Sequence, residues 1–308
     1  MKRVVIAAIV AATLIGTKAE AQQLPQFTQY MFNTYIVNPA VGGTNNFYQI
    51  RYNNRFQWVG VPDAPQTYSL SAYGPHGSKD MGFGGTFYYD VTGPTSRTGG
   101  LFSYSYNMQI TEDGWRMSGG ISLGFLMFGM DRSKFDYGDG MIIDDPAILG
   151  AKSVFTPDAS LGVLLYSTRF FVGLSAHQLF GQRLYRTELL GNEGEQYYGA
   201  NRLRQHFMLS GGTIIMLNED FELEPSALIK YMYTGPMQFD INAKLTYRNQ
   251  FWGGLSGRWQ DGIAILFGYN HENRLLFGYS FDYSLTGIRT FQGGSHEIMI
   301  GYLFDSLK

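Results

Sequence analysis

The chain has 308 residues, with 23 Lys and Arg against 25 Asp and Glu, so its formal net charge is −2 at pH 7. The charge balance gives no sign of nucleic-acid binding, and the lack of Cys excludes disulfides, thiolate metal sites, catalytic thiols and lipid attachment through Cys. Aromatic residues make up 16% of the sequence, charged residues only 16%, and Gly numbers 39. This composition is typical of a transmembrane β-barrel, whose outer face is apolar and whose inner face is small and polar.

Residues 1–21 are predicted to be a secretory signal peptide. Lys2 and Arg3 precede an apolar run at 4–16, and Ala19, Glu20 and Ala21 form a cleavage site. A membrane anchor is disfavoured, because the run is too short to cross a hydrocarbon core of about 30 Å. The mature chain would carry 23 − 3 basic and 25 − 1 acidic residues, a net charge of −4. We expect an exported protein of the outer membrane.

Residues 22–46 contain no charged side chain and show no alternation of apolar and polar residues. Left outside a core, their aromatic and aliphatic side chains would form an exposed apolar patch. We therefore expect this segment to be a plug that fills the lumen of a barrel or its periplasmic mouth. The candidate plug residues are Phe27, Tyr30, Met31, Asn33, Asn38 and Pro39.

The tripeptide Asn38-Pro39-Ala40 also occurs at the pores of water channels. That interpretation requires a bundle of membrane-spanning helices, and no apolar run after the signal approaches the necessary 18 residues. Pro39 instead fixes its own φ and disfavours helix at Asn38. Gly42 and Gly43 then allow the chain to turn into the first strand.

The rest of the chain, 47–304, is dominated by alternation with a period of two. Between Met237 and Tyr247 every odd position is apolar and every even position is polar, as in a strand with one oily face and one wet face. A β-sandwich or propeller would also alternate, but its solvent face would carry more charge than the Gly, Ser and Asn found here. We predict an all-β transmembrane barrel of about 14 antiparallel strands. These strands are expected at 47–58, 66–73, 81–90, 98–109, 115–128, 154–167, 169–178, 205–216, 220–232, 236–247, 250–258, 262–270, 273–283 and 294–304.

The predicted connections alternate in length. If the first strand runs outward, the periplasmic turns are short, whereas the outer loops include two long ones at 129–153 and 179–204 and a third at 284–293. Short inner turns and long outer loops are expected of an outer-membrane barrel. Residues 305–308 would form a C-terminal tail.

Charged residues on the predicted inner face lie in the hairpin that turns near Gly235. Either Lys230 lies opposite Asp240 or Glu224 lies opposite Lys244, depending on the register. These candidate lumen charges are Glu222, Glu224, Lys230, Asp240 and Lys244. Many inward glycines also predict the close approach of another backbone.

No enzyme or metal site emerges from the sequence. Only His296 of the five His has Ser and Glu neighbours, and on a strand it would point away from them, so the three do not form a triad. The acidic loop 131–145 does not match the spacing of an EF-hand. We expect no enzymatic activity and no cofactor, and an ion in this loop is left open.

The second long outer loop is rich in Arg and Tyr. These side chains dominate binding hot spots, although contact with neighbouring loops would use them equally well. The candidate partner-binding residues are Arg183, Tyr185, Arg186, Tyr197, Tyr198 and Arg202.

Three stretches resemble the PorP/SprF family of outer-membrane proteins of the type IX secretion system of Bacteroidota. They are the opening stretch 25–33 followed by Asn38-Pro39-Ala40, the turn at 90–99, and the closing strand at 295–302. The family turn often carries a basic residue where this chain has Val91 and Thr92, so a basic role there does not transfer.

The resemblance implies an accessory of protein secretion. Family members work with type IX translocon components and with a cognate, often adhesin-like, secreted protein whose C-terminal signal domain they help to export or retain. Some serve gliding motility. Membrane lipid and lipopolysaccharide would surround the barrel. The alternative is a porin or a channel for hydrophobic solutes.

Overall fold

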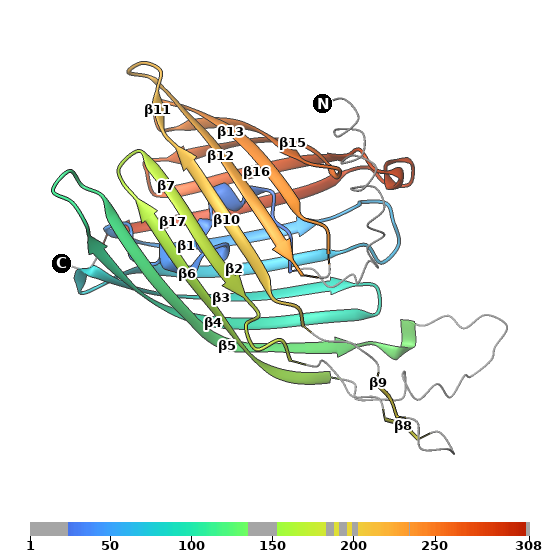
Figure 1. Cartoon of the computed structure of the whole chain (residues 1–308). Coiled ribbons are helices and arrows are strands. Elements are labelled where there is room, and N and C mark those ends of the chain that lie inside the picture. The colour runs from blue at the N-terminus through green and yellow to red at the C-terminus, as the bar shows by residue number, and fades with distance from the viewer. Residues whose placement is uncertain are drawn as a thin grey trace, which may run out of the picture.

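The computed structural model describes residues 24–134, 153–182, 188–190, 196–198, 203–233 and 235–305. They form one closed antiparallel barrel, which Figure 1 shows from the side. The sheet closes because β10 pairs with both β7 and β12. β10 and the short β11 both pair with β12 and together form one strand, so the barrel has 14 strands. The predicted fold class is confirmed.

The barrel strands follow the chain order around the sheet. Their bounds are β1 Phe47–Phe56, β2 Gln66–His76, β3 Ser78–Thr92, β4 Thr95–Gln109, β5 Arg116–Met130, β6 Ser153–Tyr166, β7 Phe170–His177, β10 His206–Thr213, β11 Ile215–Met216, β12 Phe221–Met232, β13 Gln238–Tyr247, β14 Phe251–Arg258, β15 Gly262–His271, β16 Leu275–Ser284 and β17 Ser295–Asp305. Each observed strand overlaps a predicted one, and most ends agree within a few residues.

Two hairpin turns are shorter than predicted: β2 ends at His76 and β3 begins at Ser78 where 73 and 81 were expected, and the β3–β4 turn is short as well. The sequence predicted a loop between strands ending at 90 and beginning at 98, but β3 continues to Thr92 and β4 begins at Thr95. The turn needs only Gly93 and Pro94, and Gly93 adopts a φ of 56° that favours glycine. A further small hairpin, β8 Glu188–Leu190 with β9 Gln196–Tyr198, was not predicted. It lies within the long connection between β7 and β10.

The two faces of each strand differ sharply. On β4, Phe102 and Tyr106 are 59% and 50% exposed, whereas Ser103 and Asn107, which follow them directly, are 2% and 0% exposed. The exposed apolar side chains continue around the barrel from strand to strand. An apolar outer belt of this kind matches a lipid environment, and the polar inner face encloses a lumen. The described helices are all short, and none could cross a membrane.

The two ends of the barrel also differ. At one end β1 begins, β17 finishes, and the strands are joined by short turns such as 167–169 and 248–250; we call this the short-turn end. The opposite, long-loop end carries the connections 131–152 and 178–205, together with a loop containing η5 Gly287–Thr290. The predicted asymmetry of the connections is thus present.

Candidate functional site

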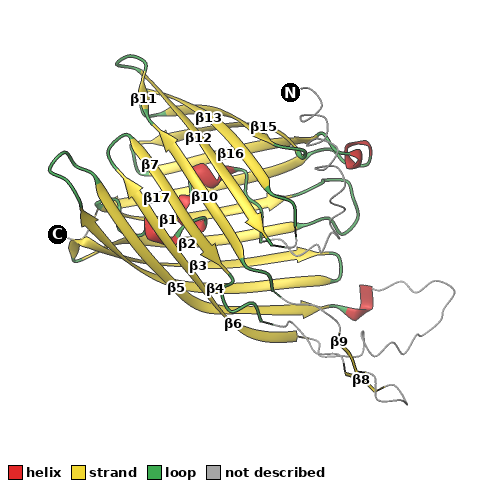
Figure 2. Cartoon of the chain, viewed as in Figure 1, coloured by secondary structure: helices red, strands yellow, loops and turns green. Residues whose placement is uncertain are grey.

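The barrel interior holds the N-terminal segment, defined as residues 24–46. Figure 2 shows three short helical turns of this segment within the ring of strands. They are η1 Gln29–Met31, η2 Thr34–Ile36 and η3 Pro39–Val41. Asn38 is extended at φ −147°, and its side-chain Oδ1 accepts a hydrogen bond from the Ala40 N–H at 2.9 Å. Asn38 therefore begins η3 as its N-cap and lines no water pore of the kind its tripeptide suggests.

The first part of the segment lies in the long-loop half of the lumen. Thr28 donates its backbone N–H to Glu297 at 2.7 Å and its hydroxyl to Asp282 at 2.6 Å. Gln29 donates its backbone N–H to the Glu297 carboxylate and its side-chain amide to the Glu297 carbonyl at 3.0 Å. Both acidic residues stand near the ends of β16 and β17 that face the long loops. These contacts fix the start of the segment against the barrel wall.

The same carboxylates belong to a buried ionic network. Arg55 lies directly opposite Glu297 in the β1–β17 pairing, contacts it at 3.4 Å, and binds Asp282 at 2.6 Å. Arg55 also donates to the Thr28 hydroxyl at 2.7 Å. Arg258 on β14 extends the network to Asp261 at 2.9 Å and to Asp240 at 3.4 Å. Arg55 and Glu297 are almost fully buried, and Arg55 is the cation that compensates the charge of Glu297.

The middle of the segment is held by neutral hydrogen bonds. The Asn33 amide donates to Ser71 at 2.9 Å and to Asn53 at 3.1 Å. The Tyr35 ring stacks on Tyr73 with 4.3 Å between centroids. The Val37 carbonyl accepts the hydroxyl of Ser175 at 2.6 Å and lies 2.8 Å from Nε2 of His177. Polar inward side chains on β1, β2 and β7 thus satisfy the segment's buried polar groups.

The end of the segment reaches the short-turn end. The Ala40 carbonyl accepts the Ser118 hydroxyl at 2.6 Å, and the Gly42 carbonyl accepts the Ser105 hydroxyl. Gly43, with a φ of 70°, lies so close to Gly82 that a Cβ on Gly43 would be 2.5 Å from the Gly82 Cα. The segment therefore runs the length of the lumen before β1 begins.

Inward glycines make room for this backbone. A Cβ on Gly120 would lie 2.6 Å from the Ala40 nitrogen, and one on Gly162 would overlap the Asn38 side chain. A Cβ on the neighbouring Gly119, which points out of the barrel, would meet nothing within 4 Å. Gly120 and Gly162 on the inner face thus leave the space that the backbone of the segment occupies.

The predicted lumen charges come together in the β12–β13 hairpin. Glu224 lies opposite Lys244 in the register, and their side chains form an ion pair. Of the two registers that the sequence left open, this second one is present. Lys230 lies opposite Gln238 and reaches diagonally to Asp240 at 3.0 Å. Glu222 lies opposite Thr246. The Lys230 and Lys244 ammonium groups also stand 5.8 Å and 5.1 Å from the ring centroids of Tyr30 and Phe32.

The candidate plug residues all belong to the N-terminal segment. Each of them is buried, and together they contact β1, β2, β6, β7, β12, β13 and β14. They are Phe27, Tyr30, Met31, Asn33, Asn38 and Pro39.

Several sequence predictions fall on residues that the structure does not describe. The signal peptide 1–21 is among them, as are tail residues 306–308 and most of the acidic loop, 135–145. In the part of that loop that is described, Lys134 binds Asp63 at 2.9 Å. Of the partner-binding candidates, Arg183, Tyr185, Arg186 and Arg202 lie outside the described residues, and for Tyr197 and Tyr198 only the backbone in β9 is described. Within the described ranges, no group of three or more His, Asp and Glu could hold a metal ion.

The sequence analysis missed the strongest cluster in the lumen. Its members Asp282 and Arg55 form an ion pair although they lie on strands far apart in the chain. Alternation could have placed each of these side chains inside the barrel. No spacing rule, however, connects residue 28 with residues 55, 282 and 297.

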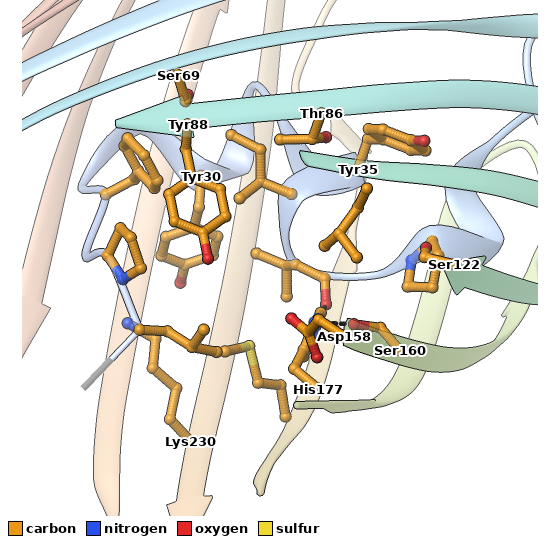
Figure 3. A pocket seen from close by; sticks show the side chains of 18 of the residues that line it. Tyr30, Tyr35, Ser69, Thr86, Tyr88, Ser122, Asp158, Ser160, His177 and Lys230 are labelled. Carbon is orange, nitrogen blue, oxygen red and sulfur yellow. Dashed lines mark hydrogen bonds between the residues drawn. The ribbon is translucent and has the colours of Figure 1, made fainter. Parts of the chain in front are cut away.

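Two of the cavities among the described residues border the middle of the segment. One lies in the long-loop half between the segment and the inner faces of β2–β7, β10 and β12, and is shown in Figure 3. The second lies toward the short-turn end and is lined by Arg169, Phe171 and Lys244 among others. Tyr30 and Val37 line both cavities and stand between them.

Comparison with known proteins gives one family and a group of similar folds. The sequence profile of the family "Type IX secretion system membrane protein PorP/SprF" matches residues 19–302. The toluene transporter TbuX of Ralstonia pickettii is similar in fold, with a TM-score of 0.53, 8% identity, and coverage of 89% of this chain and 93% of that one. The monoaromatic hydrocarbon channel CymD has a TM-score of 0.52 and 10% identity, with coverage of 92% and 94%. No curated protein sequence matches this chain.

The contact between the wall and the segment can be tested with adjacent glycines. We expect Gly120→Ala to destabilise the folded barrel by about 1–3 kcal/mol, because the new methyl group must displace the backbone at Ala40. Gly119→Ala is the matched control and should change stability little. Urea unfolding of the refolded barrel in lipid vesicles measures the difference. Equal stability of the two variants would contradict the close contact.

The buried ionic network can be tested at its centre. We expect Arg55→Ala to cost about 3–5 kcal/mol, because it leaves Glu297 buried without its cation. Arg248→Ala removes an exposed arginine that pairs with Asp220 at the short-turn end, and it should have little effect. The same unfolding measurement applies. Limited proteolysis near Thr28 should also be faster in the Arg55 variant than in the control.

Proposed function

The chain belongs to the family of type IX secretion system membrane proteins PorP/SprF, and we propose that it is a non-enzymatic accessory of secretion. In this proposal it binds the C-terminal signal domain of a cognate large secreted surface protein. Binding would aid export of that protein or retain it at the cell surface, in some cases for gliding motility. An outer-membrane barrel lies in the membrane that such a protein must cross to reach the cell surface.

The packed lumen carries this proposal. The N-terminal segment follows the wall from Thr28 to Gly43 and is bonded to strands around the barrel. We propose that it acts as a plug, so that the barrel offers a rigid scaffold and not a wide aqueous pore. Four of the charges on the β12–β13 wall, those of Glu224, Lys230, Asp240 and Lys244, pair with one another and are not free to select ions as the lining charges of a pore would be.

The partner would bind at the long-loop end. By the usual asymmetry of outer-membrane barrels, the short turns face the periplasm and the long loops face outward. The connection between β7 and β10 carries the Arg and Tyr residues predicted to contact a partner, beginning with Arg183 and Tyr185. Such side chains supply large contact areas and charge-assisted hydrogen bonds in protein interfaces. Translocon components are the second class of expected partner.

A channel for small hydrophobic solutes is the second candidate function. The cavity in the long-loop half favours it, because Leu24, Phe27 and Leu228 give it apolar walls. Two barrels of similar fold are named a toluene transporter and a monoaromatic hydrocarbon channel. Tyr30 and Val37 line both cavities, so a movement of the segment at these residues would join the two spaces.

Capture from native membranes tests the accessory role. The tagged wild-type chain should recover a large secreted protein and translocon components. A combined Arg183→Ala, Tyr185→Ala and Arg186→Ala variant should recover clearly less of the secreted protein. Arg274→Ala, at the short-turn end, is the control and should behave as wild type. Failure of the wild-type chain to recover either class of partner would contradict the proposal.

Planar-bilayer recordings separate the two candidate functions. The intact chain is expected to be nearly silent, because the N-terminal segment occupies the lumen. A variant lacking residues 24–40 should conduct if it still folds, which heat-dependent mobility on gels reports. Large steady channels from the intact protein would contradict the plug and favour a porin. Saturable toluene uptake by vesicles containing the silent protein would favour the hydrophobic-solute channel.

A further inference from the structure

The cavity in the long-loop half contains a polar corner within apolar walls. Phe27, Tyr30 and Met208 line its apolar side. Figure 3 shows Asp158 and His177 close together at one side of the cavity and Lys230 at the other. The segment and the strands enclose this space together, so the cavity exists only when the segment is in place.

Asp158 is the unusual group in this corner. It is only 4% exposed, and its Oδ1 accepts a hydrogen bond from the N–H of the adjacent Ala159 at 2.8 Å. Within the described ranges it forms no ion pair. Nearby His177 is engaged by the Val37 carbonyl at 2.8 Å and by the Ser160 hydroxyl at 3.2 Å. The buried carboxylate thus faces the cavity without a cation.

The cation across the cavity does not compensate Asp158. The Lys230 ammonium binds Asp240 at 3.0 Å, and a second positive charge, Arg258, approaches the same carboxylate at 3.4 Å. Ser69, 2% exposed, also lines the cavity with a hydroxyl oxygen that has no partner among the described residues. The wall therefore offers unused acceptor capacity and no unpaired cation among its described side chains.

An unpaired buried carboxylate is expensive, and a bound cation that donates hydrogen bonds removes the cost. The remaining walls suit an apolar body, and the rings of Tyr30 and Tyr88 can face a positive charge favourably. The negative charge of Asp158 and the apolar walls of the cavity therefore disfavour an anionic ligand.

We propose that this cavity binds a small organic cation, an amine with an aromatic or branched apolar body. The protonated nitrogen donates to Asp158, and the apolar body packs against Phe27, Met208 and Leu228. This site is separate from the proposed partner surface on the loops. In this proposal the N-terminal segment both occupies the lumen and forms one wall of the binding site.

Binding to the isolated barrel in detergent tests this site without reference to secretion. Phenethylamine is the probe, with 2-phenylethanol and 3-phenylpropionate as neutral and anionic analogues of similar shape. At about pH 8 a carboxyl group is ionised and an alkylamine is protonated. Titration calorimetry should rank the amine first, the alcohol second and the acid last. Weaker binding of the amine than of the acid, or no saturable binding of the amine, would overturn the proposal.

Variants separate the charge from the cavity. Asp158→Asn should weaken binding of the amine by about tenfold or more and leave the alcohol nearly unchanged. Glu222→Gln, which removes an inner-face carboxylate outside the cavity lining, is the matched control and should bind as wild type. Ser122→Phe should fill the cavity and weaken both ligands while keeping Asp158. Unchanged amine binding in both the Asp158 and Ser122 variants would show that the ligand binds elsewhere and would overturn the proposal.

Discussion

The buried contact between Arg55 and Glu297 organises the interior of this barrel. The two residues lie opposite each other on β1 and β17, the strands that join the beginning and the end of the barrel. The same carboxylate accepts the backbone N–H groups of Thr28 and Gln29. One ionic centre therefore bonds the first strand, the last strand and the N-terminal segment together. Because removal of Arg55 leaves Glu297 as a buried unpaired charge, closure in this register and placement of the segment depend on the same contact.

Much of the barrel could be predicted because its main rule is local. In a strand between lipid and lumen, apolar and polar side chains must alternate. The stretch from Met237 to Tyr247 can therefore be assigned as a strand from its sequence alone. A pair on neighbouring strands, such as Glu224 with Lys244, also follows once a hairpin is recognised. The Arg55 network could not be predicted in this way, since Thr28, Arg55 and Asp282 are joined by the closure of the whole sheet. The β3–β4 turn was missed for a smaller reason, because Gly93 and Pro94 make a turn without interrupting the pairing.

For the N-terminal segment, burial could likewise be predicted from composition, but its direction through the lumen could not. Its apolar, uncharged residues predict burial, but burial alone does not say which end of the lumen they enter. The contacts set the direction, from Thr28 near the long loops to Gly43 at the short-turn end. The inward glycines of the wall indicated in the sequence that another backbone lies close to them. Which residues approach them, such as Ala40 beside Gly120, could be learned only from the structure.

The route of the segment also explains where space remains. Gly82, Gly120 and Gly162 draw the segment onto the wall formed by β3, β5 and β6. Facing it, Met208 and Leu228 on β10 and β12 form one cluster with Phe27, Tyr30 and Val37 of the segment. A chain that follows one side of a barrel in short helical turns cannot fill the other side completely. The cavities beside Tyr30 and Val37 are therefore a consequence of the same glycine contacts that fix the segment, and ligand binding there would respond to any movement of it.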